Sequence, residues 1–158
     1  MKKLLFFLLL TVCLSAQPSS EAEVRGLLSD FLTAFNNLDW QPFRKCWTDK
    51  PVVFYPSLVP NATGRRTDEL AGFESAWRRQ FDVIREAAVK RGQTQAPFQN
   101  IEPKDVRIDF PSDTVAVVTF HLGPNNNVLG RRMLVVVKTA AGWKISHLHA
   151  SNLPLPTQ

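Results

Sequence analysis

The sequence predicts a single α+β domain in which N-terminal helices precede an antiparallel sheet. Three observations carry this prediction. Up to about residue 92, apolar residues recur at helical steps of three and four. Beyond residue 105 they alternate with polar residues in runs that short turns connect. The 158 residues, 44% hydrophobic and 21% charged, are typical of one globular domain and exclude global disorder.

The first sixteen residues have the features of a secretory signal peptide. Lys2 and Lys3 precede an apolar run from Leu4 to Leu14, and small residues follow at Ser15 and Ala16. The run is too short to span a bilayer, which needs about 20 apolar residues. We therefore expect residues 1–16 to be removed and the protein to be exported, to the periplasm or the medium.

Two alternatives concern the processing site. Cleavage after Ser15 is the first. A lipid anchor on Cys13 is the second, and it is disfavoured because Val12 stands where a small residue is expected.

Removal of this segment changes the composition. Without Lys2 and Lys3 the chain has 17 basic and 14 acidic residues and a net charge of +3. Cys46 then remains as a single cysteine, so no internal disulfide is expected. The basic residues form only short pairs, so we expect no nucleic-acid partner, and the mature chain has no expected transmembrane segment.

Three helices are predicted in the first part of the chain. Ser20 and Glu23 have the spacing of a capping box before a helix that runs to about residue 38. Asp39 is expected to cap a short second helix with Pro42 in its first turn. The third helix runs from about Thr67 to Gly92, with an apolar face of Leu70, Phe73, Trp77, Phe81, Ile84 and Ala88.

Five strands are predicted. The first lies between Pro51 and Pro56, ahead of the third helix. The other four follow that helix and are joined by short turns, which predicts an antiparallel meander over residues 106–110, 114–122, 128–139 and 143–150.

The end of the chain resembles a known family. The run Gly142-Trp143-Lys144-Ile145-Ser146-His147-Leu148-His149-Ala150-Ser151 is similar to the terminal strand of SnoaL-like domains in the nuclear transport factor 2-like (NTF2-like) superfamily. The order of the preceding elements agrees over residues 20–152, leaving 153–158 as a tail. The resemblance implies a cone-shaped fold with a curved antiparallel sheet wrapped on helices, an open pocket and frequent dimers. It does not settle the activity, since members include isomerases, cyclases, dehydratases and binding modules.

The last strand supplies the acid-base candidates. Strict alternation would place Trp143, Ile145, His147 and His149 on one face. If that face lines the family's pocket, His147 or His149 could transfer a proton near neutral pH. The alternative is a pair of hydrogen-bonded histidines in a polar core. His121 could join them at a metal, but a carboxylate partner is missing from the motif, so neither a metal nor another cofactor is expected.

Aromatic and basic residues supply the ligand-binding candidates. Trp47, Phe54, Tyr55, Trp77 and Phe81 could wall an apolar pocket, and Tyr55 adds a hydroxyl. For most of these the alternative is a place in the core. His121 and Arg131 complete the predicted site, with Arg131, or the adjacent Arg132, attracting an acidic ligand.

The sequence therefore favours an exported domain that binds a small, largely apolar molecule. Two alternatives stay open. One is an isomerase, cyclase or dehydratase in which a pocket histidine moves a proton while Tyr55 orients an oxygen. The other is a non-catalytic module that acts through protein interaction. A homodimer is expected in each case from the resemblance.

Overall fold

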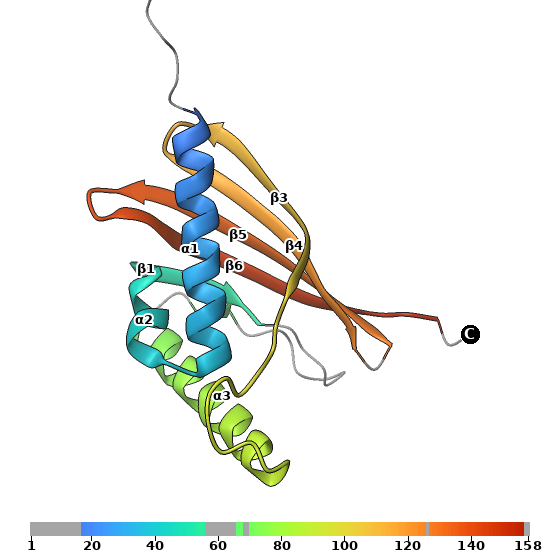
Figure 1. The fold of residues 1–158 in the computed structure, drawn as a ribbon. Coiled ribbons are helices and arrows are strands. Elements are labelled where there is room, and N and C mark those ends of the chain that lie inside the picture. Colours follow the sequence, from blue (N-terminus) through green and yellow to red (C-terminus); the bar gives the residue numbers. More distant parts are fainter. Residues whose placement is uncertain (1–16, 56–65, 68–69, 126, 157–158) are drawn as a thin grey trace, which may run out of the picture.

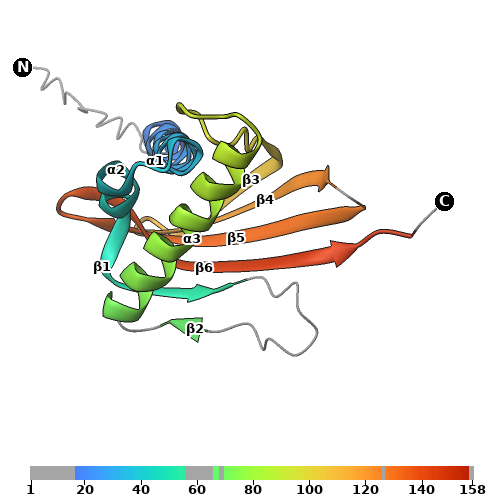
Figure 2. The ribbon, with the colours of Figure 1, turned by 90° about the horizontal axis from the view of Figure 1, so that it is seen from below.

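In this computed structural model, the described part of the protein has three helices packed on one face of a twisted six-stranded sheet (Figures 1 and 2). The structure describes residues 17–55, 66–67, 70–125 and 127–156, so the expected signal peptide over 1–16 lies outside the described residues. The helices are α1 (Gln17–Asn37), α2 (Trp40–Lys45) and α3 (Leu70–Lys90). The strands are β1 (Trp47–Phe54), β2 (Arg66–Thr67), β3 (Pro103–Ser112), β4 (Val115–Asn125), β5 (Val128–Thr139) and β6 (Gly142–Pro154).

The predicted α+β class and the helices-then-sheet order are confirmed. The strand order is β2-β1-β6-β5-β4-β3, and β3 to β6 form the predicted antiparallel meander. One part of the prediction is wrong, because β1 pairs in parallel with β6 and makes the sheet mixed. No helix in the described part of the chain is long and apolar enough to cross a membrane.

Several element ends differ from the expectation: β1 begins four residues early, α3 begins at Leu70, and β3 extends beyond both expected ends. The two-residue strand β2 is not among the five predicted strands. Helix α1 begins at Gln17, so Ser20 and Glu23 lie inside it, and Glu23 instead accepts a hydrogen bond from Trp143 Nε1 at 2.9 Å. Asp39 occupies the N-cap position of α2 but makes no side-chain capping bond. Strand β6 continues to Pro154, two residues into the segment expected as a tail.

A β-bulge divides β6 into two parts. Val136 pairs with Ile145 and Val135 with His147, so Ser146 is an extra residue on the β6 side. Its hydroxyl donates a hydrogen bond to the carbonyl of Val135 at 3.1 Å. Because one residue is inserted, the side chains beyond the bulge alternate in the opposite sense.

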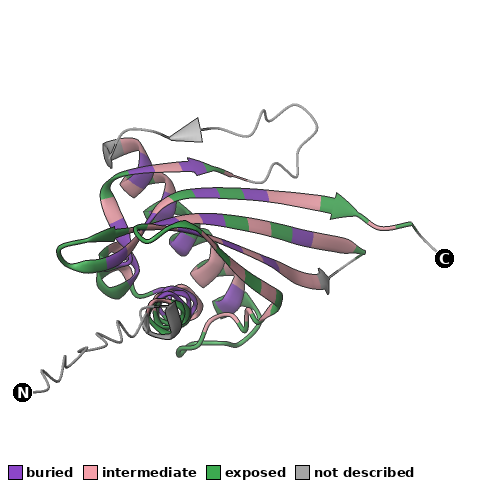
Figure 3. Ribbon diagram, turned by 90° about the horizontal axis from the view of Figure 1, so that it is seen from above, coloured by how far each residue is buried: buried purple, intermediate pink, exposed green. Residues whose placement is uncertain are grey.

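The core lies between the helices and the inner face of the sheet (Figure 3). At its centre the fully buried Phe43 of α2 lies 4.9–6.1 Å, ring centroid to centroid, from six other aromatic rings. The six rings are those of Phe31, Phe35, Trp40, Trp47, Trp77 and Phe81. They come from all three helices and β1, so the Phe43 side chain links four elements.

We predict that Phe43→Ala lowers the free energy of unfolding by about 3–5 kcal/mol, because it removes buried area and leaves a cavity that six rings cannot fill. Urea denaturation followed by tryptophan fluorescence measures the change. Val83→Ala on α3, where the side chain is 55% exposed, is the control and should change the stability by less than about 0.5 kcal/mol. Equal effects of the two substitutions would contradict the central role of Phe43.

Candidate functional site

A cavity of about 340 Å³ opens between the helices and the inner face of the sheet. Its wall is mostly apolar, with contributions from α1, α3, the segment before β3, β4 and β6. The apolar residues are Phe31, Leu32, Phe35, Trp77, Ile84, Ile101, Phe120, Leu122, Leu148 and Ala150. Four polar side chains interrupt this wall: Tyr55, Gln80, Gln99 and Arg132. A mostly apolar cavity with a few convergent polar groups is the usual form of a small-molecule site.

Helical spacing explains the apolar part of the wall. Phe31 and Phe35 are one turn apart on α1, and Trp77 and Ile84 are two turns apart on α3, so each helix presents a stripe to the sheet. The Tyr55 and Trp77 ring centroids are 5.5 Å apart, which brings the end of β1 against α3.

Asn36 positions another part of the wall. Its backbone carbonyl accepts hydrogen bonds from the backbone amides of Phe98 (2.8 Å) and Gln99 (3.2 Å). Its side-chain amide binds the backbone of Ile101 in both directions, accepting at 2.9 Å and donating at 3.2 Å. This clamp holds the segment before β3 against the end of α1 and so places Gln99 and Ile101 at the cavity.

Two buried donors near the cavity have no hydrogen-bond partner among the described residues. They are the indole Nε1 of Trp77 and the amide Nε2 of Gln99, both from residues that line the wall. Buried polar groups are normally satisfied, and leaving one unsatisfied costs about 1–3 kcal/mol. The site therefore has unused capacity to donate hydrogen bonds.

The sequence model of the SnoaL-like domain family matches residues 24–156 of this chain. The chain belongs to the SnoaL-like domain family. No curated protein matches the chain in sequence.

Solved structures share the fold of this SnoaL-like domain at low sequence identity. A cystatin-like fold protein from Burkholderia xenovorans is 18% identical, with a TM-score of 0.65 over 89% of this chain and 96% of that one. An NTF2-like protein of unknown function from Pseudomonas putida is 15% identical, with a TM-score of 0.63 over 85% and 87%. A proposed dehydratase of the NTF2-like family from Streptomyces avermitilis is 15% identical, with a TM-score of 0.65 over 86% and 97%. These likenesses place the SnoaL-like domain in the NTF2-like fold.

The structure divides the predicted site residues into two groups. Tyr55 and Trp77 line the cavity, as the predicted aromatic wall requires. Trp47 and Phe81 lie in the core behind that wall, 3% exposed each, and do not reach the cavity.

The other predicted residues lie on the outer face of the sheet. Beyond the Ser146 bulge, Leu148 and Ala150 point to the helices, whereas His147 and His149 are exposed. The expectation that both histidines share a face with Trp143 and Ile145 is therefore wrong, because it assumed unbroken alternation.

His149 lies in an open hollow of the outer face together with His121 and Arg131. His121 Nδ1 is 3.7 Å from Asp105 Oδ2, and this carboxylate is its one ion-pairing partner in the described part of the chain. No group of three or more metal-ligating side chains is assembled there or elsewhere among the described residues.

Of the two adjacent arginines, Arg132 is the one that faces the cavity, and the alternation of side chains along β5 could have predicted this. Leu134 and Val136 of β5 are buried, so Arg132 shares their inward face and Arg131 faces out. The sequence does not reveal which positions of this strand face inward, because Val135, Val136 and Val137 are all apolar. Gln99 carries no pattern, because it is placed by the Asn36 clamp in a loop.

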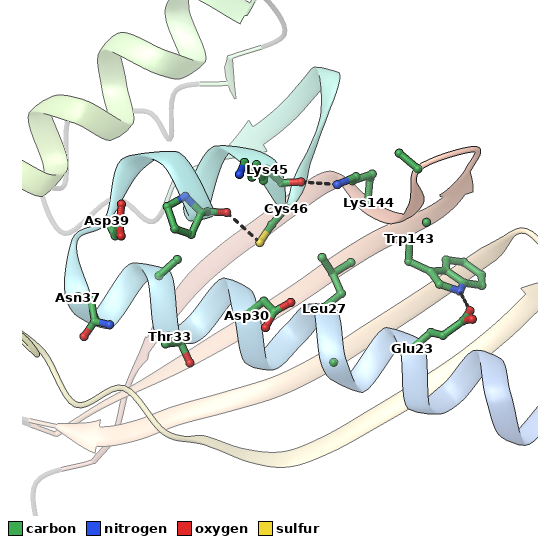
Figure 4. A pocket seen from close by; sticks show the side chains of 15 residues that line it. Glu23, Leu27, Asp30, Thr33, Asn37, Asp39, Lys45, Cys46, Trp143 and Lys144 are labelled. Atoms are coloured by element: carbon green, nitrogen blue, oxygen red, sulfur yellow. Dashed lines mark hydrogen bonds between the residues drawn. The ribbon is translucent and has the colours of Figure 1, made fainter.

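A further open hollow lies between α1, α2 and the β5–β6 turn (Figure 4). Its floor holds the thiol of Cys46, which donates a hydrogen bond to the Pro42 carbonyl at 3.4 Å. Burial, reinforced by the charge of Asp30 and opposed by Lys144, raises the pKa of the Cys46 thiol to about 11. The cysteine is thus a packed, protonated side chain at neutral pH and not a nucleophile.

We predict that Cys46 reacts roughly a hundredfold more slowly with an aromatic disulfide reagent at pH 8.5 in the native protein than in urea, because native burial suppresses the thiolate. The Cys13→Ser variant of the full chain isolates this thiol. The native rate should rise with pH toward 11. A native rate equal to the rate in urea would show that the thiol is accessible and ionised.

Proposed function

We propose that this chain is an exported SnoaL-like domain that binds a small, largely apolar molecule in the cavity between α1, α3 and the sheet. The supporting observation is the cavity itself, which is about 340 Å³ in volume and has a predominantly apolar wall within an otherwise packed core. Space of this size fits a molecule of one or two rings, and burial of its apolar surface would drive binding.

The described wall favours binding over proton transfer. It contains no histidine, aspartate or glutamate among the residues that the structure describes, and both histidines of the alternative mechanism lie on the outer face. General acid-base catalysis needs a proton-transferring group within hydrogen-bond reach of the reacting atom, most often His, Asp or Glu and less often Lys, Tyr or Cys. The isomerase, cyclase or dehydratase alternative in its histidine form therefore receives no support from this geometry, although Tyr55 of that alternative does line the wall.

We predict that a neutral two-ring probe, naphthalene-2-acetamide, raises the unfolding temperature by roughly 5–10 °C at about a hundred times its Kd, through binding to the native state alone. Ala150→Leu adds three carbons to the cavity wall and should abolish most of this shift. Differential scanning fluorimetry measures both proteins.

Ala140→Leu, on the exposed β5–β6 turn, is the matched control and should preserve the shift. A shift that survives Ala150→Leu would place the probe elsewhere. The absence of any shift in the unsubstituted protein would remove the support for binding of this class of molecule.

We also propose export and self-association. Export rests on the charged, apolar and small-residue segments over residues 1–16. Homodimer formation is supported by large apolar side chains on the outer sheet face, where Phe54, Met133 and Leu153 are 40–42% exposed. The register sets Phe54 and Met133 on either side of His149, so they form one surface that a second copy could cover.

Native mass spectrometry of the exported protein tests both statements. We expect a dimer of chains that begin at Gln17, and Met133→Glu should shift the population toward monomer by placing a charge in the contact. Chains that retain residues 1–16 would contradict export with cleavage. A monomer at micromolar concentration would contradict the dimer.

A further inference from the structure

Arg132 is the only charged side chain that the structure places in the described cavity wall. It stands where the cavity meets a cleft at the sheet end, and the two share Gln99, Ile101, Leu122 and Arg132. The apolar wall thus has one cationic position, and that position is at its boundary.

The guanidinium of Arg132 is held by neutral acceptors alone. Its Nη1 donates to the carbonyls of Arg131 (2.9 Å) and Ser151 (3.0 Å) and to Asn152 Oδ1 (3.4 Å). No carboxylate in the described part of the chain lies within ion-pair distance, and no described acceptor takes a hydrogen bond from Nε or Nη2. Three of the five N–H donors of this guanidinium, one on Nε and two on Nη2, therefore have no acceptor within the described protein.

An unpaired guanidinium in this position is costly. Burial lowers the pKa of Arg132 from its ordinary value, which reports that the charged form is poorly solvated. Arginine keeps its charge in proteins, so the compensation must come from an anion or from water. The adjoining cleft also holds Glu102 and Lys104, but Glu102 accepts a hydrogen bond from Asn100 (3.2 Å) and is absent from the cavity wall.

The backbone beneath Arg132 leaves room for this side chain. A Cβ at Gly130 would lie 3.3 Å from Nη1 and 3.4 Å from Nη2 of Arg132, and 3.1 Å from Leu122 Cβ. Gly130 and Arg132 share the inner face of β5, so a larger residue at 130 would press on the guanidinium. The absence of a side chain at 130 lets the guanidinium lie along the strand.

We propose that the ligand of this cavity carries a carboxylate, which pairs with Arg132 while an apolar body lies against the aromatic wall. The inference rests on the proposed function, because it assumes that the cavity is the binding site. The buried Nε2 of Gln99, a residue that with Arg132 lines both the cavity and the adjoining cleft, supplies a further unpartnered donor for an anionic oxygen. A guanidinium fork matches the two oxygens of a carboxylate.

Two probes of nearly equal shape separate charge from size. Naphthalene-2-acetate and naphthalene-2-acetamide are titrated into the full chain at pH 7 and 0.1 M salt by isothermal titration calorimetry. We expect the acetate to bind roughly ten- to a hundredfold more tightly than the acetamide. Arg132→Met keeps the apolar stem and should bring the two affinities to within about threefold of one another while leaving acetamide binding nearly unchanged.

Arg131→Met is the matched control, because it removes the same charge one residue away on the outer face and should retain the preference for the acetate. If Arg132→Met does not fold, Arg132→Lys replaces it. The loss of the planar fork should then lower the preference severalfold, and an unchanged preference would overturn the inference.

The outcomes distinguish the two proposals. Equal affinities of both probes for the unsubstituted protein would overturn the inference that the ligand carries a carboxylate, while leaving the proposed function intact. An acetate preference that disappears in Arg131→Met but persists in Arg132→Met also overturns it, since the anion then binds at the outer face. Failure of both probes to bind overturns the proposed function, and the inference with it.

Discussion

The bulge at Ser146 is the constraint on which the arrangement of this site depends. One extra residue in β6 reverses the alternation of its side chains, and the Ser146 hydroxyl bridges the inserted position to the Val135 carbonyl. As a result Leu148 and Ala150 enter the cavity wall, while His147 and His149 are exposed on the outer face. Without the bulge, two imidazoles would face the aromatic core and the small side chain of Ala150 would be lost from the cavity.

The cavity between the helices and the sheet lies beside the cluster of aromatic rings around Phe43. Phe43 joins α1, α2, α3 and β1 through ring contacts and leaves no room at its centre. Phe31, Phe35 and Trp77 pack against Phe43 and also line the cavity, and a loop held by Asn36 completes the wall. An apolar cavity that ends at a single guanidinium is polarised, so it suits an amphipathic molecule better than a purely apolar one.

The helical and strand periods predicted most of the fold, because both reflect short-range geometry that the side-chain pattern records directly. Phe73, Trp77 and Phe81 were expected on one helix face and are buried together. The parallel pairing of β1 with β6 could not be predicted, since it joins strands about a hundred residues apart. Of the site, Tyr55 and Trp77 were predicted, whereas Gln99 and Asn36 act through a loop conformation that has no period.

The sequence alone determined the α+β class, the order of the elements, the burial of the aromatic stripes and the resemblance to SnoaL-like domains. Only the tertiary structure decided which of two adjacent arginines faces the cavity and which of the expected residues meet. The reason is physical. Alternation shows that neighbouring residues of a strand point to opposite faces of the sheet, but it does not say which face is the inner one. An inserted residue or an unbroken apolar run removes the remaining signal from the sequence. Which side chains point inward is decided when the strands pair and helices cover one face of the sheet.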